Sequence, residues 1–562
     1  MENIIFSPGS RLAPVILAFE QQTNIQKRVV VDERVAGFVA LGIAQQTRKP
    51  VGLVCTSGTA MLNYAPAIAE AYYQRIPLVV MSADRPQEWI DQADMQSIQQ
   101  PEVFENFIRK SVNLSAADES ADGIWYNQRL VSEALNASIS GEPGPVHINV
   151  PLKEPLYETE KVSKSENPKI FKQAELRKKL SDASQKELAA KWKSYDRKLI
   201  LIGLHHPDPI LNDLLAELAE DPSVVIMGET CSNLQGSFFF ENIDRVVEVL
   251  FNEFSEDLHP NLVVTMGGMI VSKKIKQFLR KHQPQEHWHV RSNGEPADTF
   301  RSLTQVIAME ARDFANEMLQ FPTKKDASFQ EMLAALDSSN YLGHLDYLRV
   351  SPYCDLTVFA SILDVIPTQT NLQLGNSTPV RYANLFPLYD KELTINSNRG
   401  VGGIDGTTST AIGAAMASGD KLTTLITGDL AFFYDSNGLW QEKLPSNLRI
   451  ILINNGGGNI FRIIPGPEST GVMEKYFEAG HNLDGSYYAK MFGLKYSTAK
   501  NHNDVSDELK KFWSPSESPK LLEIFTDGEV SANVLKGYFD HIKKDFGPTA
   551  KKFRKMMAEM KK

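Results

Sequence analysis

Cysteine is scarce in this sequence, and the 59 basic residues are outnumbered by 69 acidic ones. Three cysteines, Cys55, Cys231 and Cys354, occur among 562 residues, and they are far apart and odd in number. That pattern excludes a disulfide framework and a paired-cysteine metal site, and it fits a reducing cytoplasm. The formal net charge of -10 argues against a nucleic-acid-binding protein, which usually carries a basic domain or stripe. Any anionic ligand must therefore meet locally placed cations.

Long hydrophobic runs are absent as well, since no stretch of about 18 apolar residues occurs. The opening residues, MENIIFSPGSRLAP, lack a basic segment followed by a long apolar core. We therefore expect a cytoplasmic chain that is neither secreted nor membrane-spanning. What is present is an ordinary globular composition, 42% hydrophobic and 23% charged. The length predicts about three or four domains.

Short apolar runs alternate with helical patterns through most of the chain, which is typical of α/β domains built around parallel sheets. Three blocks of this kind are predicted, at residues 1–160, 190–325 and 345–562. A charged stretch without a strand pattern links the first two blocks and leads into a helix, and a helical connector precedes the third. The basic end of the chain, AKKFRKMMAEMKK, predicts a solvated helix, with docking to a membrane surface as the alternative.

The first and third blocks share one order of elements, in which a helix, a strand, a further helix and a second strand follow each other. In the first block 26 residues separate Gly58 from Asp84, and in the third block 26 residues separate Gly428 from Asn454. Similar spacing alone is weak evidence for a repeat, but spacing and order together predict two similar domains that flank a different one.

Polar, glycine-rich residues end two neighbouring strands of the third block. Asp429 follows one apolar run, and Asn455 followed by Gly456-Gly457-Gly458 ends the next. Because ligands bind at the carboxyl ends of parallel strands, we expect the Asp429 carboxylate and the Asn455 amide oxygen to meet there. Such hard oxygen donors suit magnesium, and glycines let the backbone face a phosphate. The alternative is that each cluster is only a turn signal.

A dinucleotide is the competing ligand, and the stretch NRGVGGIDGTTSTAIG is where its fingerprint would lie. The third glycine position of that fingerprint holds Asp405, so the pattern fails. The stretch still predicts a glycine-rich turn into a helix near Thr407, which can approach a phosphate or a flat ring closely.

Four arginines each lie just beyond a predicted strand, namely Arg11, Arg85, Arg381 and Arg399. A lone loop arginine is usually a solvated charge or the partner of a nearby acid. Four at equivalent positions in an acidic protein favour a ligand with several carboxylates, because guanidinium groups bind carboxylates at two points.

The segment GDLAFFYDSNGLWQEKLPSNLRIILINN resembles the thiamine diphosphate motif, Gly-Asp followed at this spacing by Asn-Asn. Together with DERVAGFVALGIA, CTSGTA, SADRP, GNSTPVR, NRGVGGIDG and NNGGGNIF, it resembles the 2-succinyl-5-enolpyruvyl-6-hydroxy-3-cyclohexene-1-carboxylate synthases of menaquinone biosynthesis. The resemblance covers the first and third blocks and is thin in the middle one. It implies a pyrimidine-binding, a central and a diphosphate-binding domain, with the active site between chains of a homodimer or homotetramer.

The resemblance also implies roles at the cofactor. Asp429, Asn455 and the Gly457 carbonyl would bind Mg²⁺ or Mn²⁺, and Ile404 would hold thiamine diphosphate bent. Glu33 would be the catalytic carboxylate that hydrogen-bonds the aminopyrimidine ring and promotes its imino tautomer. From the residues alone, the favoured interpretation of Glu33 is an acid in the first turn of a helix, where its charge interacts favourably with the helix dipole. The full cofactor set is Glu33, Gly403, Ile404, Asp405, Gly428, Asp429, Leu430, Asn455, Gly457, Gly458 and Ile460.

The implied activity is the decarboxylation of 2-oxoglutarate and the 1,4-addition of the resulting carbanion to isochorismate, and both substrates carry two carboxylates. The implied substrate residues are Ser10, Arg11, Arg85, Gln96, Lys273, Lys274, Ser377, Arg381, Arg399, Phe461 and Ile464. The sequence departs from the family twice, with Met95 in place of the usual asparagine and Lys274 in place of a common arginine. Both positions are expected to affect how isochorismate fits in the site.

Two other functions stay open. A thiamine-dependent 2-oxoacid decarboxylase or acetolactate-type carboligase would act on small monocarboxylates and would not need four such arginines. A non-catalytic subunit would keep the fold without the chemistry, although the joint presence of Glu33, Asp429 and Asn455 argues against it. His147 and Cys55 are expected to be packed core residues, and the paired histidines 205–206 and 287–289 lack metal-ligand spacing with a cysteine or acid.

Overall fold

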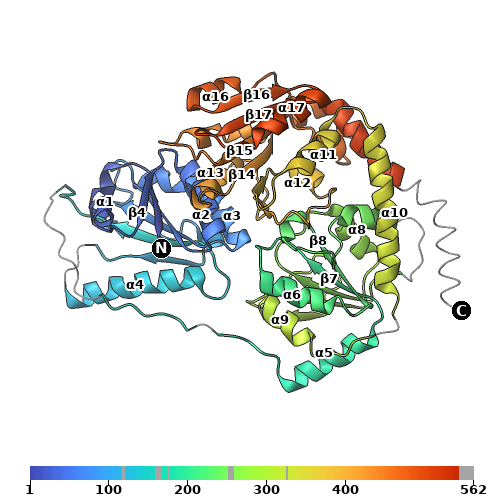
Figure 1. Ribbon diagram of the computed structural model, residues 1–562. Helices are drawn as coiled ribbons and strands as arrows, with labels where there is room; N and C mark the ends of the chain where they lie inside the picture. Colours follow the sequence, from blue (N-terminus) through green and yellow to red (C-terminus); the bar gives the residue numbers. More distant parts are fainter. Residues whose placement is uncertain (117–119, 158–167, 175, 251–257, 325–326, 543–562) are drawn as a thin grey trace, which may run out of the picture.

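The computed structural model describes residues 1–116, 120–157, 168–174, 176–250, 258–324 and 327–542. Three parallel sheets with helices packed on them form an α/β fold, as the alternating pattern predicts (Figure 1). The sheets lie within the three predicted blocks, whose bounds stay predictions. The predicted helix at the basic end, residues 550–562, lies outside the described residues.

The first sheet has six strands in the order β2-β1-β3-β4-β6-β5. Its strands are β1 (Asn3–Phe6), β2 (Gln26–Val29), β3 (Val51–Cys55), β4 (Leu78–Asp84), β5 (Lys110–Asn113) and β6 (Val146–Pro151). Its helices are α1 (Ala13–Glu20), α2 (Glu33–Thr47), α3 (Ala65–Gln74) and α4 (Ala121–Ile139). The central strand β3 is buried on both faces, which explains its unbroken apolar sequence VGLVC.

The second sheet has five strands in the order β11-β10-β9-β7-β8. They are β7 (Lys198–Ile202), β8 (Val224–Gly228), β9 (Leu262–Met266), β10 (Glu286–Val290) and β11 (Gln305–Ile307). The charged stretch before this sheet ends in α5 (Asp182–Ser194), and α6 (Pro209–Leu218), α7 (Ile243–Leu250), α8 (Lys273–Lys281) and α9 (Ala311–Met318) follow. The helical connector is α10 (Phe329–Val350), as predicted.

The third sheet has the order β13-β12-β14-β15-β17-β16, which repeats the first sheet strand for strand. Its strands are β12 (Asn371–Leu374), β13 (Thr394–Ser397), β14 (Thr423–Gly428), β15 (Leu448–Asn454), β16 (Lys495–Ala499) and β17 (Lys520–Phe525). Its helices are α11 (Asp355–Val365), α12 (Thr378–Ala383), α13 (Thr407–Ala417), α14 (Asp429–Tyr434), α15 (Ile460–Ile463), α16 (Ser486–Phe492) and α17 (His502–Phe512). The matching order confirms the prediction of two similar domains.

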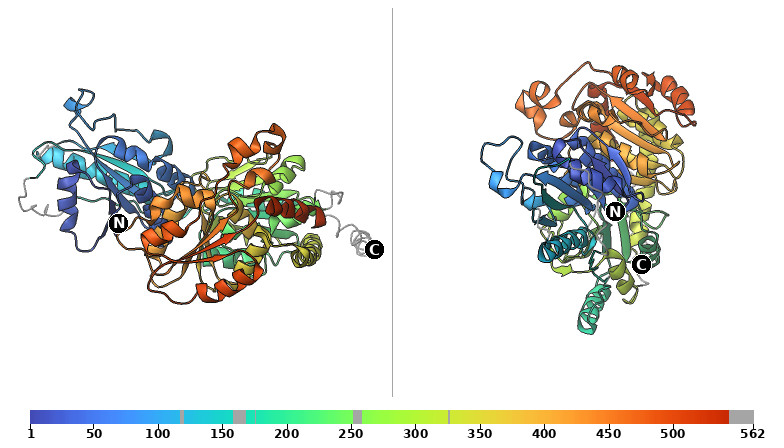
Figure 2. Two further views of the ribbon diagram at one scale, coloured as in Figure 1. Left: turned by 90° about the horizontal axis from the view of Figure 1, so that it is seen from above. Right: turned by 90° about the vertical axis from the view of Figure 1, so that its left-hand side faces the viewer.

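Helices α2 and α13 join the first and third sheets into one packed body (Figures 1 and 2). The two helices approach so closely that a Cβ atom on Gly42 would clash with the Thr410 carbonyl oxygen. In the same way, a Cβ atom on Gly413 would clash with the Val39 carbonyl oxygen. One apolar core runs through this contact, so the placement of one sheet is fixed relative to the other.

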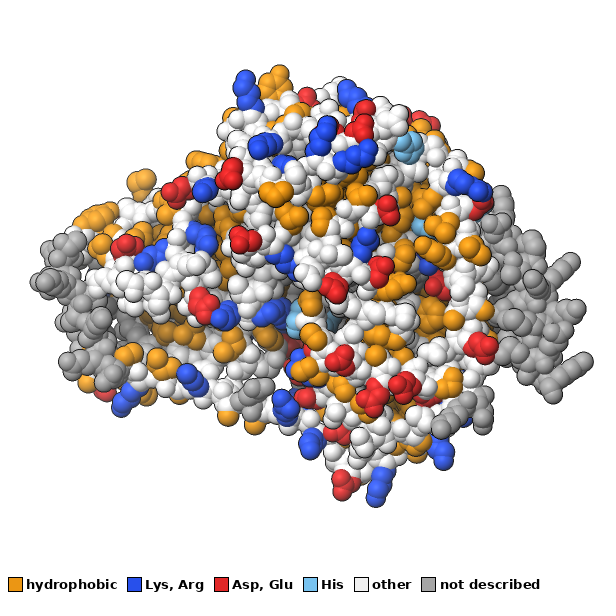
Figure 3. All heavy atoms as spheres, viewed as in Figure 1, with side chains coloured by type: hydrophobic (Ala, Val, Ile, Leu, Met, Phe, Trp, Pro, Cys, Tyr) orange, Lys and Arg blue, Asp and Glu red, His pale blue; other side chains and the backbone are white. Residues whose placement is uncertain are grey.

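Charged side chains of both signs are interspersed over the face in Figure 3 and do not gather into one basic stripe among its described residues. Across the described ranges, the structure contains no helix that combines the length and the apolar character needed to cross a bilayer.

Candidate active site

Asp429 lies where β14 passes into α14, and 2% of its surface is exposed. Its Oδ2 atom accepts backbone N–H groups of the next strand's end, from Asn455 at 3.1 Å, Gly456 at 2.8 Å and Gly457 at 3.0 Å. Strands β14 and β15 pair in parallel with their carboxyl ends level. The two polar clusters therefore meet at one edge of the third sheet.

The Asn455 side chain is held by an acid from a third element. Its Nδ2 atom donates to Oδ2 of Asp355 at 3.0 Å, and Asp355 begins α11 fully buried. The other oxygen of Asp355 accepts the Thr526 hydroxyl at 2.5 Å. Because the side-chain nitrogen of Asn455 donates to this acid, the side-chain oxygen Oδ1 is the atom of the amide that can bind a cation.

The glycine loop after β15 has a conformation that other residues rarely adopt. Gly456 has a φ of 82° and Gly457 a φ of 154°. A Cβ atom on Gly457 would lie 2.8 Å from the Glu478 carbonyl oxygen, which accepts the Gly458 N–H at 2.6 Å. The His481 N–H donates to the Gly456 carbonyl at 3.0 Å. The segment 478–481 therefore holds the loop in place.

Burial raises the pKa of Asp429, and the His481 imidazole, whose Nε2 lies 3.4 Å from Oδ2, opposes that rise. A carboxylate in so dry a place is stabilised by a cation. Nearby, the Asn459 amide is buried with no hydrogen-bond partner for either Nδ2 or Oδ1 among the described residues. A buried orphan amide and hard oxygen donors at a glycine loop fit a metal ion that carries a diphosphate.

The loop that contains Gly403, Ile404 and Asp405 precedes α13 and is half-buried. The Arg34 guanidinium, from the start of α2, donates to the Asp405 carbonyl and pairs with Asp435 at 2.8 Å. Leu430 at the start of α14 and Ile460 at the start of α15 are half-buried and flank the two strand ends.

Glu33 is the first residue of α2, but the helix cap is its neighbour Asp32, whose side chain accepts the Val35 N–H at 3.3 Å. The Glu33 carboxylate is half-buried and accepts Nδ2 of Asn63 at 3.3 Å. Its charge adds to burial in raising the pKa of the Cys55 thiol. Asp32 therefore caps this helix, and the Glu33 carboxylate is not needed for the cap.

Four of the residues expected to bind substrate line one cavity of about 440 Å³ at the first sheet. They are Ser10, Arg11, Arg85 and Gln96, and the rest of the lining is residues 154–157. Arg11 is buried and donates to the Leu152 carbonyl at 2.9 Å and to Glu154 at 3.2 Å.

Arg85 pairs with Asp94 at 3.0 Å and donates from Nη2 to the Met95 carbonyl at 2.9 Å. Position 95 therefore contributes its backbone to Arg85, while the Met95 side chain is 79% exposed. The nearby acids are the partners expected of ordinary loop arginines, yet both arginines still line the cavity.

Arg381 and Arg399 form a second group at the third sheet. The Arg381 guanidinium donates to the Ser377 carbonyl, and Arg399 donates to Oδ1 of Asn376 at 2.5 Å. Burial, and after it the charge of Arg399, lower the pKa of Arg381. Two partly buried guanidinium groups that repel each other create a site that favours an anion.

The remaining expected substrate residues are more scattered. Lys273 is exposed at the start of α8, while Lys274 pairs with Glu248 and its Nζ lies 3.9 Å from the Phe539 ring centroid. Phe461 in α15 packs its ring at 5.7 Å from that of Phe477, and Ile464 follows the helix half-buried.

Asp355 and His481 are site residues that the sequence did not indicate. Asp355 looks like an ordinary acid at a helix start, and only the fold shows that it holds Asn455. His481 lies in a loop with no strand pattern, and nothing in the chain order places it beside Asp429.

The other chemically versatile residues are structural. His147 is fully buried and bonds the hydroxyls of Ser82 at 2.8 Å and Ser111 at 3.2 Å, which confirms a packed, satisfied histidine. His287 and His289 both bond the Thr265 hydroxyl. The three cysteines are buried free thiols.

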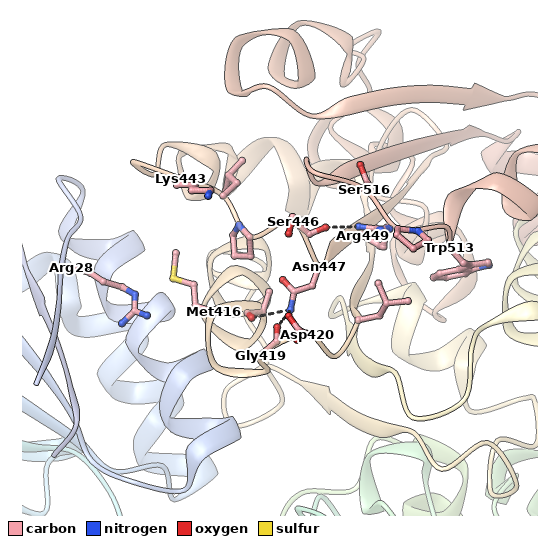
Figure 4. Close-up of a pocket in the computed structure, with 15 residues that line it drawn as sticks. Arg28, Met416, Gly419, Asp420, Lys443, Ser446, Asn447, Arg449, Trp513 and Ser516 are labelled. Atoms are coloured by element: carbon pink, nitrogen blue, oxygen red, sulfur yellow. Dashed lines mark hydrogen bonds between the residues drawn. The ribbon is translucent and has the colours of Figure 1, made fainter. Parts of the chain in front are cut away.

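A further cavity of about 550 Å³ lies at the amino ends of β14, β15 and β17, opposite the polar strand ends (Figure 4). Its Asn447 side chain donates to the carbonyls of Ala415, Gly419 and Lys421. The Arg449 guanidinium likewise donates to backbone carbonyls, among them that of Ser446 at 2.8 Å. Through these hydrogen bonds, the two side chains hold the loops at the amino ends of the strands in place.

Comparison with known proteins identifies the three sheets. The models for the N-terminal binding domain, the middle domain and the C-terminal binding domain of thiamine pyrophosphate enzymes match residues 1–103, 213–374 and 375–524. The 2-succinyl-5-enolpyruvyl-6-hydroxy-3-cyclohexene-1-carboxylate synthase of Christiangramia forsetii is 42% identical, over 97% of this chain and 96% of the relative. The chain belongs to this synthase family.

Other members of the synthase family agree. The enzyme of Flavobacterium johnsoniae is 42% identical over 96% of both chains, and that of Bacteroides thetaiotaomicron is 35% identical over 96% of both. A crystal structure of benzoylformate decarboxylase from Polynucleobacter necessarius superposes with a TM-score of 0.70 at 13% identity, covering 94% of this chain and 96% of that one. That likeness shows the fold alone. This synthase family member is a thiamine diphosphate-dependent enzyme of α/β fold.

Proposed function

We propose that the protein is a 2-succinyl-5-enolpyruvyl-6-hydroxy-3-cyclohexene-1-carboxylate synthase that acts in menaquinone biosynthesis. It decarboxylates 2-oxoglutarate and joins the remaining four carbons to isochorismate by 1,4-addition. The observation that carries this proposal is the family match over nearly the whole chain, together with the meeting of Asp429 and Asn455 at one sheet edge.

The chemistry of the product supports these substrates. Its name describes a succinyl group, an enolpyruvyl group and a ring carboxylate, so the product carries three carboxylates. The chain offers two arginine groups, Arg11 with Arg85 at the first sheet and Arg381 with Arg399 at the third. A carboligase for small monocarboxylates would not use so many guanidinium groups.

We propose that Mg²⁺ or Mn²⁺ would be bound by the Asp429 carboxylate, the side-chain oxygen of Asn455 and the backbone carbonyl of Gly457. The metal ion would in turn bind the diphosphate. Bound thiamine diphosphate would supply carbanion chemistry at its thiazolium ring. The protein's own contribution would be orientation, with Ile404 as a support beneath the cofactor and the Glu33 carboxylate as the hydrogen-bond and proton-transfer partner of the aminopyrimidine.

We further propose a homodimer or homotetramer whose active sites lie between chains. The cavity with Arg11 and Arg85 is lined by residues 10–157 alone among the described residues, whereas Arg381 and Arg399 belong to the third sheet. One substrate can use both groups if a second chain supplies one of them. The three free thiols support a reducing cytoplasm as the location.

The test is an assay of the purified protein with isochorismate and 2-oxoglutarate, with and without thiamine diphosphate and Mg²⁺. The proposal predicts release of carbon dioxide coupled to loss of isochorismate only when both cofactors are present. Release of carbon dioxide at a rate that does not depend on isochorismate would instead indicate a simple 2-oxoacid decarboxylase.

A further inference from the structure

A buried carboxylate on a helix beside the first sheet holds a loop that follows a strand of the third sheet. Glu70 lies in α3, and 2% of its surface is exposed. It accepts three successive backbone N–H groups, from Gly400 at 2.5 Å, Val401 at 2.7 Å and Gly402 at 3.3 Å. Hydrogen bonds to an ionised acceptor are stronger than neutral ones, so three of them on one carboxylate fix this backbone firmly.

A second side chain of α3 strengthens the same contact. Gln74, one helical turn after Glu70, donates its Nε2 to Oε1 of Glu70 at 2.5 Å and to the Ser397 carbonyl at 3.3 Å. The approach is so close that a Cβ atom on Gly400 would lie 2.6 Å from the Glu70 carbonyl oxygen and 2.9 Å from its Oε1. Glycine at position 400 is therefore required by this contact.

The held loop connects the proposed substrate and cofactor sites. Arg399 immediately precedes it and Ile404 follows it by two residues. Asn376 bridges the ends, because its Nδ2 donates to the Gly402 carbonyl while its Oδ1 accepts from Arg399. A shift of residues 400–402 would therefore move both Arg399 and the support beneath the cofactor.

We infer that Glu70 is a positioning residue for the reaction, which acts through the backbone of residues 400–402 to set the places of Arg399 and Ile404. The roles of Arg399 and Ile404 rest on the proposed function. Glu70 suits this task better than an amide, since a glutamine would turn an N–H donor toward backbone donors and leave at least one of them unpaired.

The experiment compares Glu70→Gln with Glu142→Gln as a matched control. Glu142 is another buried glutamate, in the connection between α4 and β6, and it contacts Arg75, Arg109 and Arg291 rather than the loop. We expect Glu70→Gln to weaken the binding of thiamine diphosphate with Mg²⁺ and to raise the KM for 2-oxoglutarate, each by about tenfold or more. We expect Glu142→Gln to lower the melting temperature and leave both quantities at wild-type values.

Calorimetry of cofactor binding separates this inference from the proposed substrates, because it needs no turnover. If Glu70→Gln lowers only the melting temperature, as the control does, the positioning role is wrong. If Glu70→Gln does not fold, Gln74→Ala decides, since it removes one neutral donor from the same contact. A few-fold loss of cofactor affinity in Gln74→Ala is then expected, and wild-type affinity would overturn the inference.

Discussion

Asp429 and Gly457, from the ends of neighbouring strands, are joined by a 3.0 Å hydrogen bond between a carboxylate and a backbone N–H. This bond aligns the acid with the glycine loop that contains the Gly457 carbonyl, which we propose as a metal ligand. The geometry thus brings a carboxylate, a side-chain amide oxygen and a glycine loop together at the sheet edge where parallel α/β sheets bind ligands.

Replacing Asp429 with alanine should abolish Mg²⁺-dependent binding of thiamine diphosphate, because the diphosphate charge is then left uncompensated. Calorimetric titration of the cofactor measures this loss. Asp420→Ala is the control, since Asp420 is an exposed acid at the opposite edge of the same sheet. Unchanged affinity in Asp429→Ala would remove Asp429 from the metal site.

Glu33→Gln should leave the melting temperature nearly unchanged, because Asp32 caps the helix. Turnover should fall by on the order of a hundredfold or more, as expected for a lost proton-transfer group. Asp32→Ala provides the contrast, with a stability loss of about 0.5–2 kcal/mol from the missing cap. Wild-type turnover in Glu33→Gln would exclude Glu33 as the activating carboxylate.

Arg381→Ala or Arg399→Ala should cost about 2–4 kcal/mol in kcat/KM, roughly thirty- to a thousandfold, because a substrate carboxylate loses its partner in a partly dry site. Lysine at either position should recover part of the loss, since an ammonium lacks the planar two-point contact. Steady-state kinetics with both substrates gives the values. Wild-type kcat/KM in both alanine variants would favour the carboligase alternative.

Acid should destabilise the fold through its buried histidines. Burial lowers the pKa of His147 and His287 to about 4 and that of His344 to about 3. The unfolded chain, whose histidines titrate at about 6.5, then binds more protons than the folded one. The stability from these neutral rings is therefore complete above about pH 6.5 and is lost as the pH falls towards 4.

Thermal unfolding as a function of pH measures this effect, with His147→Gln as the comparison. Glutamine keeps a hydrogen-bonding group near Ser82 and cannot titrate. The melting temperature of the His147→Gln variant should therefore fall less steeply below about pH 6.5 than that of the wild type. Parallel profiles for the variant and the wild type would show that His147 does not contribute.

The sequence predicts those parts of the molecule that follow from local pattern. Apolar runs with polar ends predict the strands, and the rule for parallel sheets brings Asp429 to Asn455 because β14 and β15 are consecutive and adjacent. The repeated order of elements predicts the paired architecture of the first and third sheets in the same way.

Contacts between distant segments have no such local signal. Glu70 meets Gly400 across 330 residues, and Asp355 meets Asn455 across 100. Each acid begins or lines a helix like many others, and only the packing of whole sheets decides what it faces. For the same reason the sequence did not indicate that Lys274 pairs with Glu248 beside the Phe539 ring.

The central claim is the choice of donor, and a competition between two 2-oxoacids tests it most directly. The holoenzyme receives isochorismate with equal amounts of 2-oxoglutarate and pyruvate, and mass spectrometry identifies the adduct. We predict the succinyl adduct from 2-oxoglutarate, because pyruvate has no distal carboxylate for the arginines to hold. Equal amounts of the pyruvate-derived adduct, or acetolactate in place of either, would contradict the account.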